Sequence, residues 1–264
     1  MVRALIAATA AGLMLVAGCG PRPAEHARSA PTSAKPSATT SAPAYLAEPK
    51  VGECHDLSLK AIAAASDTKK PVPCTAKHTT QTVAVVTAPP EAGKGSQDAR
   101  GFAVGAACGD GFKKVVGGDS KTRAKSLYSL AWFMPTKAQR ARGAKWMRCD
   151  VTLSDERHAY PLSGKVPLLD DGAKKGEIRC GRLRPGSGTW EFVPCTTRHQ
   201  FKPDKLIEAE PGTTWKQARK AATKACLAEG GLATWSLPEQ WGIGDRWYVC
   251  WSTVGRQKNP NAVT

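Results

Sequence analysis

Eight cysteines recur along the chain as two sets of four, and this repeat constrains the fold more than any other feature. The first set is Cys54, Cys74, Cys108 and Cys149, and the second is Cys180, Cys195, Cys226 and Cys250. The surroundings of the cysteines repeat as well: residues 72–78 (VPCTAKH) match residues 193–199 (VPCTTRH), and residues 143–149 (GAKWMRC) match residues 244–250 (GDRWYVC). Such self-similarity indicates an internal duplication, so two related units should share one fold.

Each unit is expected to run from a short strand through a second strand and a helix to a closing strand pair. The second strand is expected to hold the Val-Pro-Cys stretch and to continue past the histidine. Apolar and β-branched residues predict strands at 51–57, 81–87, 127–133 and 146–153 in the first unit, and at 177–183 and 201–209 in the second.

Residues typical of the start of a helix occur at equivalent positions in the two units. In the first unit Ser96 is a possible N-cap for a helix that places Val104, Cys108, Phe112 and Val115 on one face. In the second unit Thr214 and Gln217 form a capping box. The helix that follows presents Trp215, Ala218, Ala222, Ala225 and Cys226 on one face. A Pro135-led turn of helix, capped by Thr136 and Gln139, is expected before the last strand of the first unit.

The N-terminus has the features of a lipoprotein signal. Residues 4–16 form an apolar run behind Arg3 that is too short to cross about 30 Å of hydrocarbon as a lasting helix. Small residues then lead into Cys19, a pattern that resembles the lipobox at which signal peptidase II cuts. The alternative is an ordinary signal peptide with an incidental cysteine.

The domain plan follows from these signals. We expect a lipoprotein signal peptide at 1–18, then a lipidated, palmitate-carrying Cys19 with a disordered tether rich in Pro, Ala, Ser and Thr to residue 48. The first repeat unit is expected at 49–158, a linker at 159–175, the second unit at 176–257 and a tail at 258–264. The predicted location is the extracytoplasmic face of the cell membrane, held by the lipid.

The cysteines other than Cys19 are even in number, which in an exported protein favours disulfides. Four cysteines in a unit allow three pairings, and the sequence alone does not choose among them. The repeat favours first with second and third with fourth: Cys54 with Cys74, Cys108 with Cys149, Cys180 with Cys195, and Cys226 with Cys250. The predicted fold class is therefore α+β, with two tandem units that each have a small, mainly antiparallel sheet covered by a helix and two disulfides.

Taken together, the lipobox, the tether, the doubled Pro-Cys-x-x-x-His and the Gly-x-x-Trp-x-x-Cys ending resemble the actinobacterial septum formation family. The resemblance covers roughly residues 49–253. It implies a place in the cell envelope and a link to cell division. It brings no established catalytic residues to transfer.

Two motifs suggest chemistry, and for both we prefer a structural interpretation. Cys74 with His78 and Cys195 with His199 have residue types that bind zinc or form a nucleophile with its base. Zinc would compete with the disulfides for the same sulfurs, so we expect histidines that hydrogen-bond locally in a turn. The Ser-x-x-Lys at residues 66–69 lacks its partner motifs and is expected to be a chance match in an exposed loop.

Other acidic and aromatic residues give no clear site. The acidic neighbours Asp155/Glu156, Asp170/Asp171 and Glu208/Glu210 identify no two-carboxylate centre. Among the eight tryptophans, the candidates for an exposed sugar-stacking surface are Trp235, Trp241 and Trp251, which have no clear counterparts in the first unit. We expect no catalytic residues, no metal and no cofactor.

The charge suggests a binding surface. The chain has 38 Lys+Arg against 22 Asp+Glu, a formal net charge of +16, although only 23% of its residues are charged. This describes a basic folded protein that is attracted to anionic surfaces. The residues expected to form a surface for anionic ligands are Arg140, Arg142, Lys145, Arg148, Lys216, Arg219, Lys220 and Lys224. The alternative for any one cluster is a solvated face that keeps the protein soluble.

The function predicted from the sequence is that of a membrane-anchored, non-catalytic binding or adaptor module of the cell envelope, linked to septum formation. Its expected partners are anionic wall polymers, anionic lipids or an envelope or division protein, and export separates it from nucleic acid. One alternative is a wall-modifying hydrolase with an unrecognised site. Another is a metal-binding lipoprotein, which requires unpaired sulfurs at Cys74 and Cys195.

Overall fold

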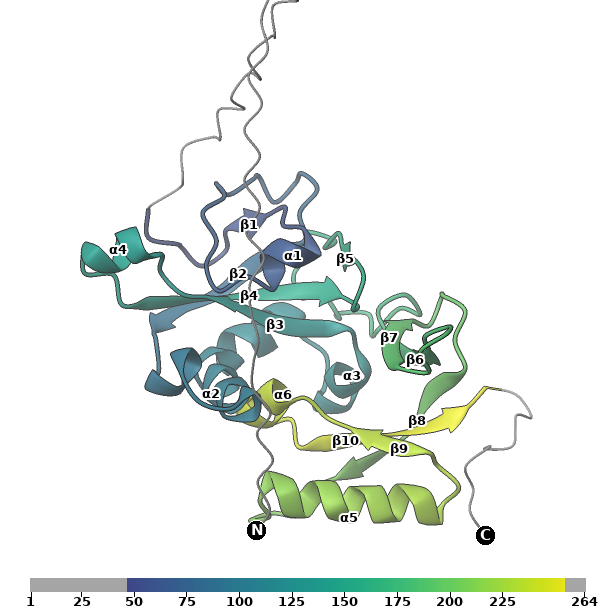
Figure 1. Ribbon diagram of the computed structural model, residues 1–264. Helices are drawn as coiled ribbons and strands as arrows, with labels where there is room; N and C mark the ends of the chain where they lie inside the picture. The colour runs from purple at the N-terminus through teal and green to yellow at the C-terminus, as the bar shows by residue number, and fades with distance from the viewer. Residues whose placement is uncertain (1–46, 255–264) are drawn as a thin grey trace, which may run out of the picture. The chain divides into compact units, whose positions relative to one another are not determined.

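The two copies of the sequence repeat fold into two sheets with the same strand order (Figure 1). The computed structural model describes residues 47–254, so the predicted signal peptide, Cys19 and nearly all of the tether lie outside the described residues. In the first sheet the order is β1 (Cys54–His55), β2 (Thr80–Thr87), β4 (Trp146–Ser154) and β3 (Tyr128–Phe133). In the second the equivalent strands are β6 (Arg179–Leu183), β8 (Phe201–Glu208), β10 (Trp247–Thr253) and β9 (Ala233–Trp235), and β7 (Trp190–Pro194) adds a fifth strand beside β6. The predicted α+β class with antiparallel sheets is confirmed.

The strand register repeats along with the order. Cys149 in β4 lies opposite Ala84 in β2, and Cys250 in β10 lies opposite Lys205 in β8. Ala84 and Lys205 stand at the same distance in sequence from the repeated histidines. Each of these two ladders also contains a register shift near the cysteine pair. The duplication is therefore one of three-dimensional structure and not of sequence alone.

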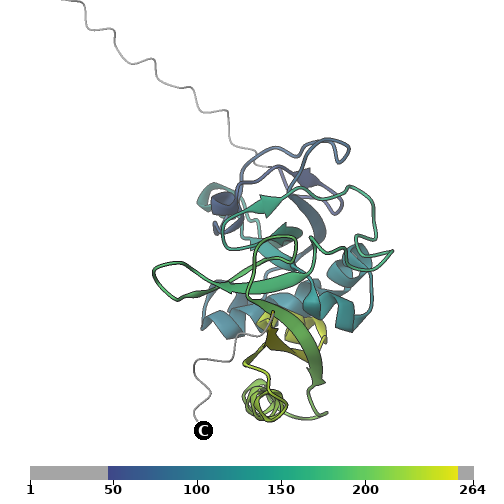
Figure 2. The same ribbon diagram turned by 90° about the vertical axis from the view of Figure 1, so that its right-hand side faces the viewer.

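Each sheet carries one long helix at the same point in the order. On the first sheet α2 (Gln97–Val116) begins where the Ser96 hydroxyl accepts a hydrogen bond of 3.2 Å from the Ala99 N–H. On the second, α5 (Trp215–Ala228) begins at the Thr214/Gln217 capping box, as predicted, and Figure 2 shows it end-on against its sheet. The faces that α2 and α5 bury include Cys108 and Cys226. The third cysteine of each set thus lies in the core.

Two short helices precede the last strands. They are α4 (Lys137–Ala141), with the predicted Thr136/Gln139 capping box, and α6 (Pro238–Ile243). Both are followed by a glycine of positive φ, 89° at Gly143 and 96° at Gly244, a conformation that glycine adopts without strain. This requirement explains why the Gly-x-x-Trp-x-x-Cys motif begins with glycine in both copies.

Four disulfides join the cysteines in the pairs that the repeat predicts. They are Cys54–Cys74, Cys108–Cys149, Cys180–Cys195 and Cys226–Cys250. The first pair of each set joins the opening strand to the turn before the histidine, and the second fastens the long helix to the last strand. Closing loops of 15 to 41 residues contributes about 3 to 4 kcal/mol per bridge in the chain-entropy treatment.

The structure corrects one predicted strand. The sequence placed Val-Pro-Cys and the residues beyond the histidine in a single strand, whereas Val193 and Pro194 end a separate strand, β7 (Trp190–Pro194), that pairs with β6. A turn closed by the Thr197 N–H and the Pro194 carbonyl, at 2.8 Å, separates β7 from β8. The equivalent turn in the first unit joins Ala76 to Pro73, also at 2.8 Å.

Several short elements were not expected from the sequence. They are α1 (Leu59–Ile62), the 3-10 helix η1 (Pro90–Gly93), α3 (Ser120–Lys125) and β5 (Ala159–Tyr160). Strand β5 pairs with β4 of the first sheet, although its residues fall in the stretch that was expected to be a linker. It has no counterpart in the other copy, whereas β7 corresponds to an isolated bridge between Val72 and Cys54 in the first unit.

The two copies meet where α6 crosses α2, and glycines allow the backbones to approach closely. A Cβ atom on Gly105 of α2 would lie 2.2 Å from the Glu239 carbonyl oxygen, and one on Gly242 of α6 would lie 2.4 Å from the Phe102 carbonyl oxygen. Only residues without a side chain fit such a crossing. Ile243 of α6 reaches the main hydrophobic core, among residues of the first unit. The described residues therefore form one body around a shared core.

A buried ion pair also joins the two copies. The Nε and Nη2 atoms of Arg123 on α3 donate to the two carboxylate oxygens of Asp245, each at 2.7 Å. Nη1 of Arg123 donates to the Gly118 carbonyl at 2.6 Å, and the Gln240 side chain donates to the Arg123 carbonyl at 3.1 Å. Both charged side chains are less than 10% exposed. Removing one partner would leave the other charge buried without compensation.

We therefore predict that Arg123→Met or Asp245→Leu alone lowers the free energy of unfolding by about 3–5 kcal/mol, measured by urea denaturation. The double variant should recover most of the loss, because an apolar pair carries no uncompensated charge. A matched control is the exposed Asp110–Lys113 pair on α2, where Asp110→Asn should cost less than about 1 kcal/mol. Single variants at Arg123 and Asp245 that cost no more than this control would contradict the role given to the pair.

Candidate functional site

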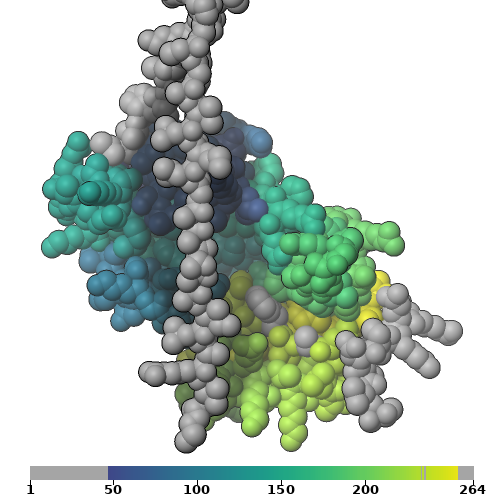
Figure 3. All heavy atoms as spheres, in the orientation of Figure 1, coloured from purple at the N-terminus to yellow at the C-terminus, as the bar shows by residue number. Residues whose placement is uncertain are grey.

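The outer face of α5 presents four of the basic residues predicted to bind anions. Lys216, Arg219, Lys220 and Lys224 are all exposed. Within the part of the chain that the structure describes, none of them forms an ion pair. In Figure 3, long side chains in the colour of α5 project from the surface.

The other face of α5 determines how this basic face is held. Ala218 and Ala222 are buried, and the Cys226–Cys250 disulfide joins the helix to β10. The helix therefore cannot rotate to change which face meets the solvent. The result is a fixed row of positive charges, which from here on we call the α5 basic face.

In the second predicted basic cluster, three of the four residues are exposed as expected. Arg140, Arg142 and Lys145 are exposed around α4, and Arg142 and Lys145 line a depression of about 510 Å³ together with Trp146 and Glu48. Arg148 was predicted to belong to this surface, and that prediction is wrong. It lies on β4, a central strand whose residues 147–153 are all buried, so both faces of the strand are covered at this point.

Arg148 instead belongs to a buried polar network beneath the first sheet. Its Nη2 lies 3.0 Å from Asp67 and 3.1 Å from Asp150, and its guanidinium lies 4.3 Å from the centre of the Phe133 ring. Thr80 and Thr82 donate hydrogen bonds of 3.0 and 2.9 Å to Asp150. Burial raises the pKa of Asp150 to about 6, against the opposing effect of Arg148. The network is enclosed, so it serves the fold and offers no surface to a ligand.

The Ser-x-x-Lys stretch is part of this network. The Asp67 side chain is only 5% exposed because it pairs with Arg148, and Lys69 donates through Nζ to the Asp56 carbonyl at 3.2 Å. The expectation of a wholly exposed loop is therefore wrong at Asp67. His55 lies beside the network, and burial and then Arg148 lower its pKa to about 4, so it is neutral at pH 7.

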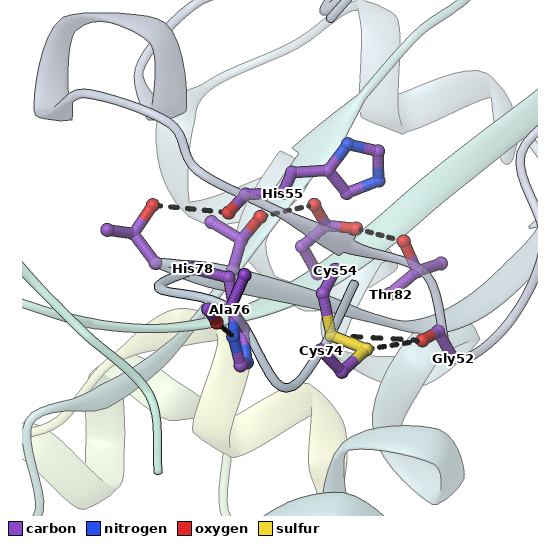
Figure 4. The surroundings of a disulfide bond; sticks show 10 residues. Gly52, Cys54, His55, Cys74, Ala76, His78 and Thr82 are labelled. Atoms are coloured by element: carbon purple, nitrogen blue, oxygen red, sulfur yellow. Dashed lines mark hydrogen bonds between the residues drawn. A yellow bond between two sulfur atoms is a disulfide. The ribbon is translucent and has the colours of Figure 1, made fainter. Parts of the chain in front are cut away.

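The repeated histidines make the local contact expected of them. His78 Nδ1 lies 2.8 Å from the Ala76 carbonyl (Figure 4), and His199 Nδ1 lies 2.7 Å from the Thr197 carbonyl. A carbonyl oxygen only accepts hydrogen bonds, so Nδ1 carries the proton in both rings.

The sulfurs of Cys74 and Cys195 are held in disulfides, so neither is available as a thiolate nucleophile or as a zinc ligand. Between residues 47 and 254 no other group of His, Cys, Asp and Glu is placed to hold a metal ion.

Two of the three tryptophan candidates, Trp241 and Trp251, are not exposed, and the side chain of Trp235 lies outside the described part of the structure. Trp251 is buried, with its ring 5.7 Å from that of Trp190. Trp241 is half-buried, packs edge-on against Trp215 at 5.3 Å and lies under the Arg246 guanidinium. Trp251 is thus a core residue, and the prediction of exposure is wrong for it.

A small acidic cavity lies where α2, α5 and α6 meet. Asp98, Glu239, Trp215 and Tyr248 line this space of about 240 Å³. Burial raises the pKa of Glu239, and the Asp98 charge adds to the effect against the opposing Arg179. This pair could not be predicted from the sequence, because Asp98 and Glu239 come from different copies of the repeat.

A cluster of arginines around one buried glutamate was also not foreseen. Glu191 on β7 is fully buried and lies opposite Arg182 on β6. The Nε atoms of Arg157 and Arg184 donate to Glu191 at 3.0 and 3.2 Å, and Nε of Arg182 donates to its other oxygen. Burial opposes ionisation of Glu191, but the hydrogen bonds from Arg182, Arg157 and Arg184 outweigh it and lower its pKa to about 2. The cross-strand pair is the signal from which this cluster could have been found.

No helix formed by residues 47–254 has the length and apolar character needed to cross a membrane.

Comparison with known protein families finds a match to part of the chain. Residues 103–230 match the family model described as septum formation. The match runs from within α2 to the end of α5, so it is narrower than the range 49–253 expected from the sequence. It contains the arginine cluster and the α5 basic face. The curated proteins and the solved structures contain no match to the chain. Residues 103–230 are therefore similar to the septum formation family.

Proposed function

We propose that this protein is a membrane-tethered, non-catalytic adaptor of the cell envelope that works in septum formation and holds anionic wall polymers against the α5 basic face. The family description supports the link to the septum. The observation that carries the binding role is the α5 basic face, with four exposed basic residues that form no ion pair among the described residues.

The electrostatic gain is sufficient for such a role. A Lys or Arg near an anionic surface contributes about 1 kcal/mol, so four on one face give a useful attraction before any specific contact forms. The attraction acts over about 10 Å at 0.1 M salt and weakens as salt is added. Because the helix is joined to β10 by a disulfide, no reorganisation is needed to present these charges.

The placement of the two basic surfaces favours wall polymers as the ligand of α5. Glu48, where the proposed tether enters the described body, lines the depression beside α4, whereas α5 lies at the other end of that body (Figures 1 and 2). With the α4 end toward the bilayer, Arg140, Arg142 and Lys145 meet anionic head groups. The α5 basic face is then presented to the wall.

The first test is charge reversal on α5. The triple variant Lys216→Glu, Lys220→Glu and Lys224→Glu should weaken binding of the purified protein to isolated anionic wall polymer by about 100-fold, since three contributions of about 1 kcal/mol are lost. The matched control reverses three exposed lysines elsewhere, Lys60, Lys70 and Lys77. Binding of the unchanged protein should fall steeply with added salt. Equal losses in both triple variants, or binding that is indifferent to salt, would refute the proposed surface.

The second test concerns the anchor, for which the support is the sequence before Cys19. Cys19→Ser should move the protein out of the membrane fraction and remove the fatty acid found by mass spectrometry. In a deletion strain the unanchored form should fail to restore division, whereas a tether control, Ser33→Ala, should restore it and gather at septa by fluorescence. Full rescue by Cys19→Ser would show that the lipid anchor is dispensable.

The competing proposal is a wall-modifying hydrolase, and one observation favours it. Glu239, with its raised pKa, and Asp98 share the acidic cavity with Trp215 and Tyr248. The space of about 240 Å³ is small beside the roughly 300–1,000 Å³ typical of ligand sites. The adaptor proposal is therefore better supported than the enzyme.

A further inference from the structure

We propose that a second, selective binding site lies beside Glu191, and that it takes a ligand with a terminal oxyanion, a phosphate or a carboxylate, on an organic body. The site, here called the arginine pocket, is a cavity of about 630 Å³ lined by residues that include Arg157, Arg182, Arg198, His199 and Leu183. It is separate from the α5 basic face, and it does not depend on the function proposed above.

The guanidinium groups at the pocket are oriented before any ligand arrives. Arg157 and Arg182 each use Nε to bind the buried Glu191 carboxylate. Their terminal Nη atoms form no hydrogen bond with any residue that the structure describes. A planar guanidinium held in this way can still offer two parallel donors to an oxyanion. Fixing the arginines beforehand also reduces the entropy lost on binding.

Positive charge remains after the internal pairs are counted. Arg184 pairs with Glu191 and lies 3.5 Å from Glu156, and Asp155 accepts hydrogen bonds from the Tyr160 hydroxyl and two backbone amides. The charged residues concerned are Arg157, Arg182, Arg184 and Arg198 against Glu191, Glu156 and Asp155. Arg198 forms no ion pair or hydrogen bond among the described residues. Arg198 is exposed, so its charge is accessible to a ligand.

The remaining lining residues indicate what else the ligand contains. His199 donates its Nδ1–H to the Thr197 carbonyl, so Nε2 is left as the ring nitrogen that can accept a hydrogen bond from the ligand. Leu183 is 41% exposed, and Pro185 lines the same cavity, which gives apolar contact next to the cations. The volume lies within the roughly 300–1,000 Å³ range of small-molecule sites. A bare inorganic ion would leave most of this space unfilled.

The pocket combines the repeated turn that holds Arg198 and His199 with parts that differ between the two copies. Glu191 lies on β7, and Arg157 lies in the turn between β4 and β5. Strand β5 has no counterpart in the other copy, and the counterpart of β7 there is a single bridge between Val72 and Cys54. The strand pairing that the two sheets share therefore does not by itself explain why these arginines lie together.

The test is titration of the purified protein in 0.15 M NaCl with two probes, glycerol 3-phosphate for the phosphate arm and citrate for the carboxylate arm, followed by calorimetry. We expect saturable binding at one site per chain for at least one probe. Arg198→Ala should weaken that binding at least tenfold, and Arg198→Lys should weaken it less, because charge is kept while the planar pair of donors is lost. Arg198 forms no described contact, so its variants should fold, and unchanged thermal unfolding checks this.

The matched control is Lys77→Ala, which removes a positive charge from the equivalent, exposed position of the first copy. It should leave binding of either probe unchanged. Binding of glycerol 3-phosphate alone identifies a phosphate site, and binding of citrate alone identifies a carboxylate site. Absence of saturable binding by both probes at 10 mM, or equal losses in Arg198→Ala and Lys77→Ala, would overturn the proposal.

Discussion

The crossing of α2 and α6 is the contact on which the rest of the structure depends, because it makes one body out of two copies. It is possible only where Gly105 and Gly242 leave the backbones free to approach. The same crossing brings Ile243 to the core of the first unit and carries Gln240 and Asp245 to Arg123. Units of about a hundred residues bury a modest fraction of their surface alone, so sharing one core adds stability that neither copy has by itself.

Much of the fold could be predicted from the sequence because its signals are local. The Thr136/Gln139 and Thr214/Gln217 capping boxes and the pairing of the repeated cysteines depend on spacing along the chain, and all appear as predicted. The glycine crossing was missed because Gly105 contributes no apolar side chain to a periodic pattern. Arg148 was wrongly predicted to be exposed. It is buried because it pairs with Asp67, which is distant in the sequence, and with Asp150, which is buried on the same strand.

The candidate sites were only partly predictable for the same reason. The α5 basic face follows from helical spacing within one segment, so the sequence identified it. The arginine pocket needs residues from the turn after β4, from the β6–β7 hairpin and from the loop before β8, and only the fold brings them together. The duplication thus supplies the scaffold together with Arg198 and His199, and residues outside the repeat, such as Arg157, complete the pocket. A broad cationic face and a narrow arginine pocket on one body suit an adaptor that first gathers near anionic polymer and then recognises a particular group.

Differential scanning calorimetry of the oxidised protein tests most directly whether the two copies form one body. The shared core predicts a single transition for which the calorimetric and van't Hoff enthalpies agree, with all four disulfides intact. Two separable transitions, or one copy that melts while the other stays folded, would contradict it.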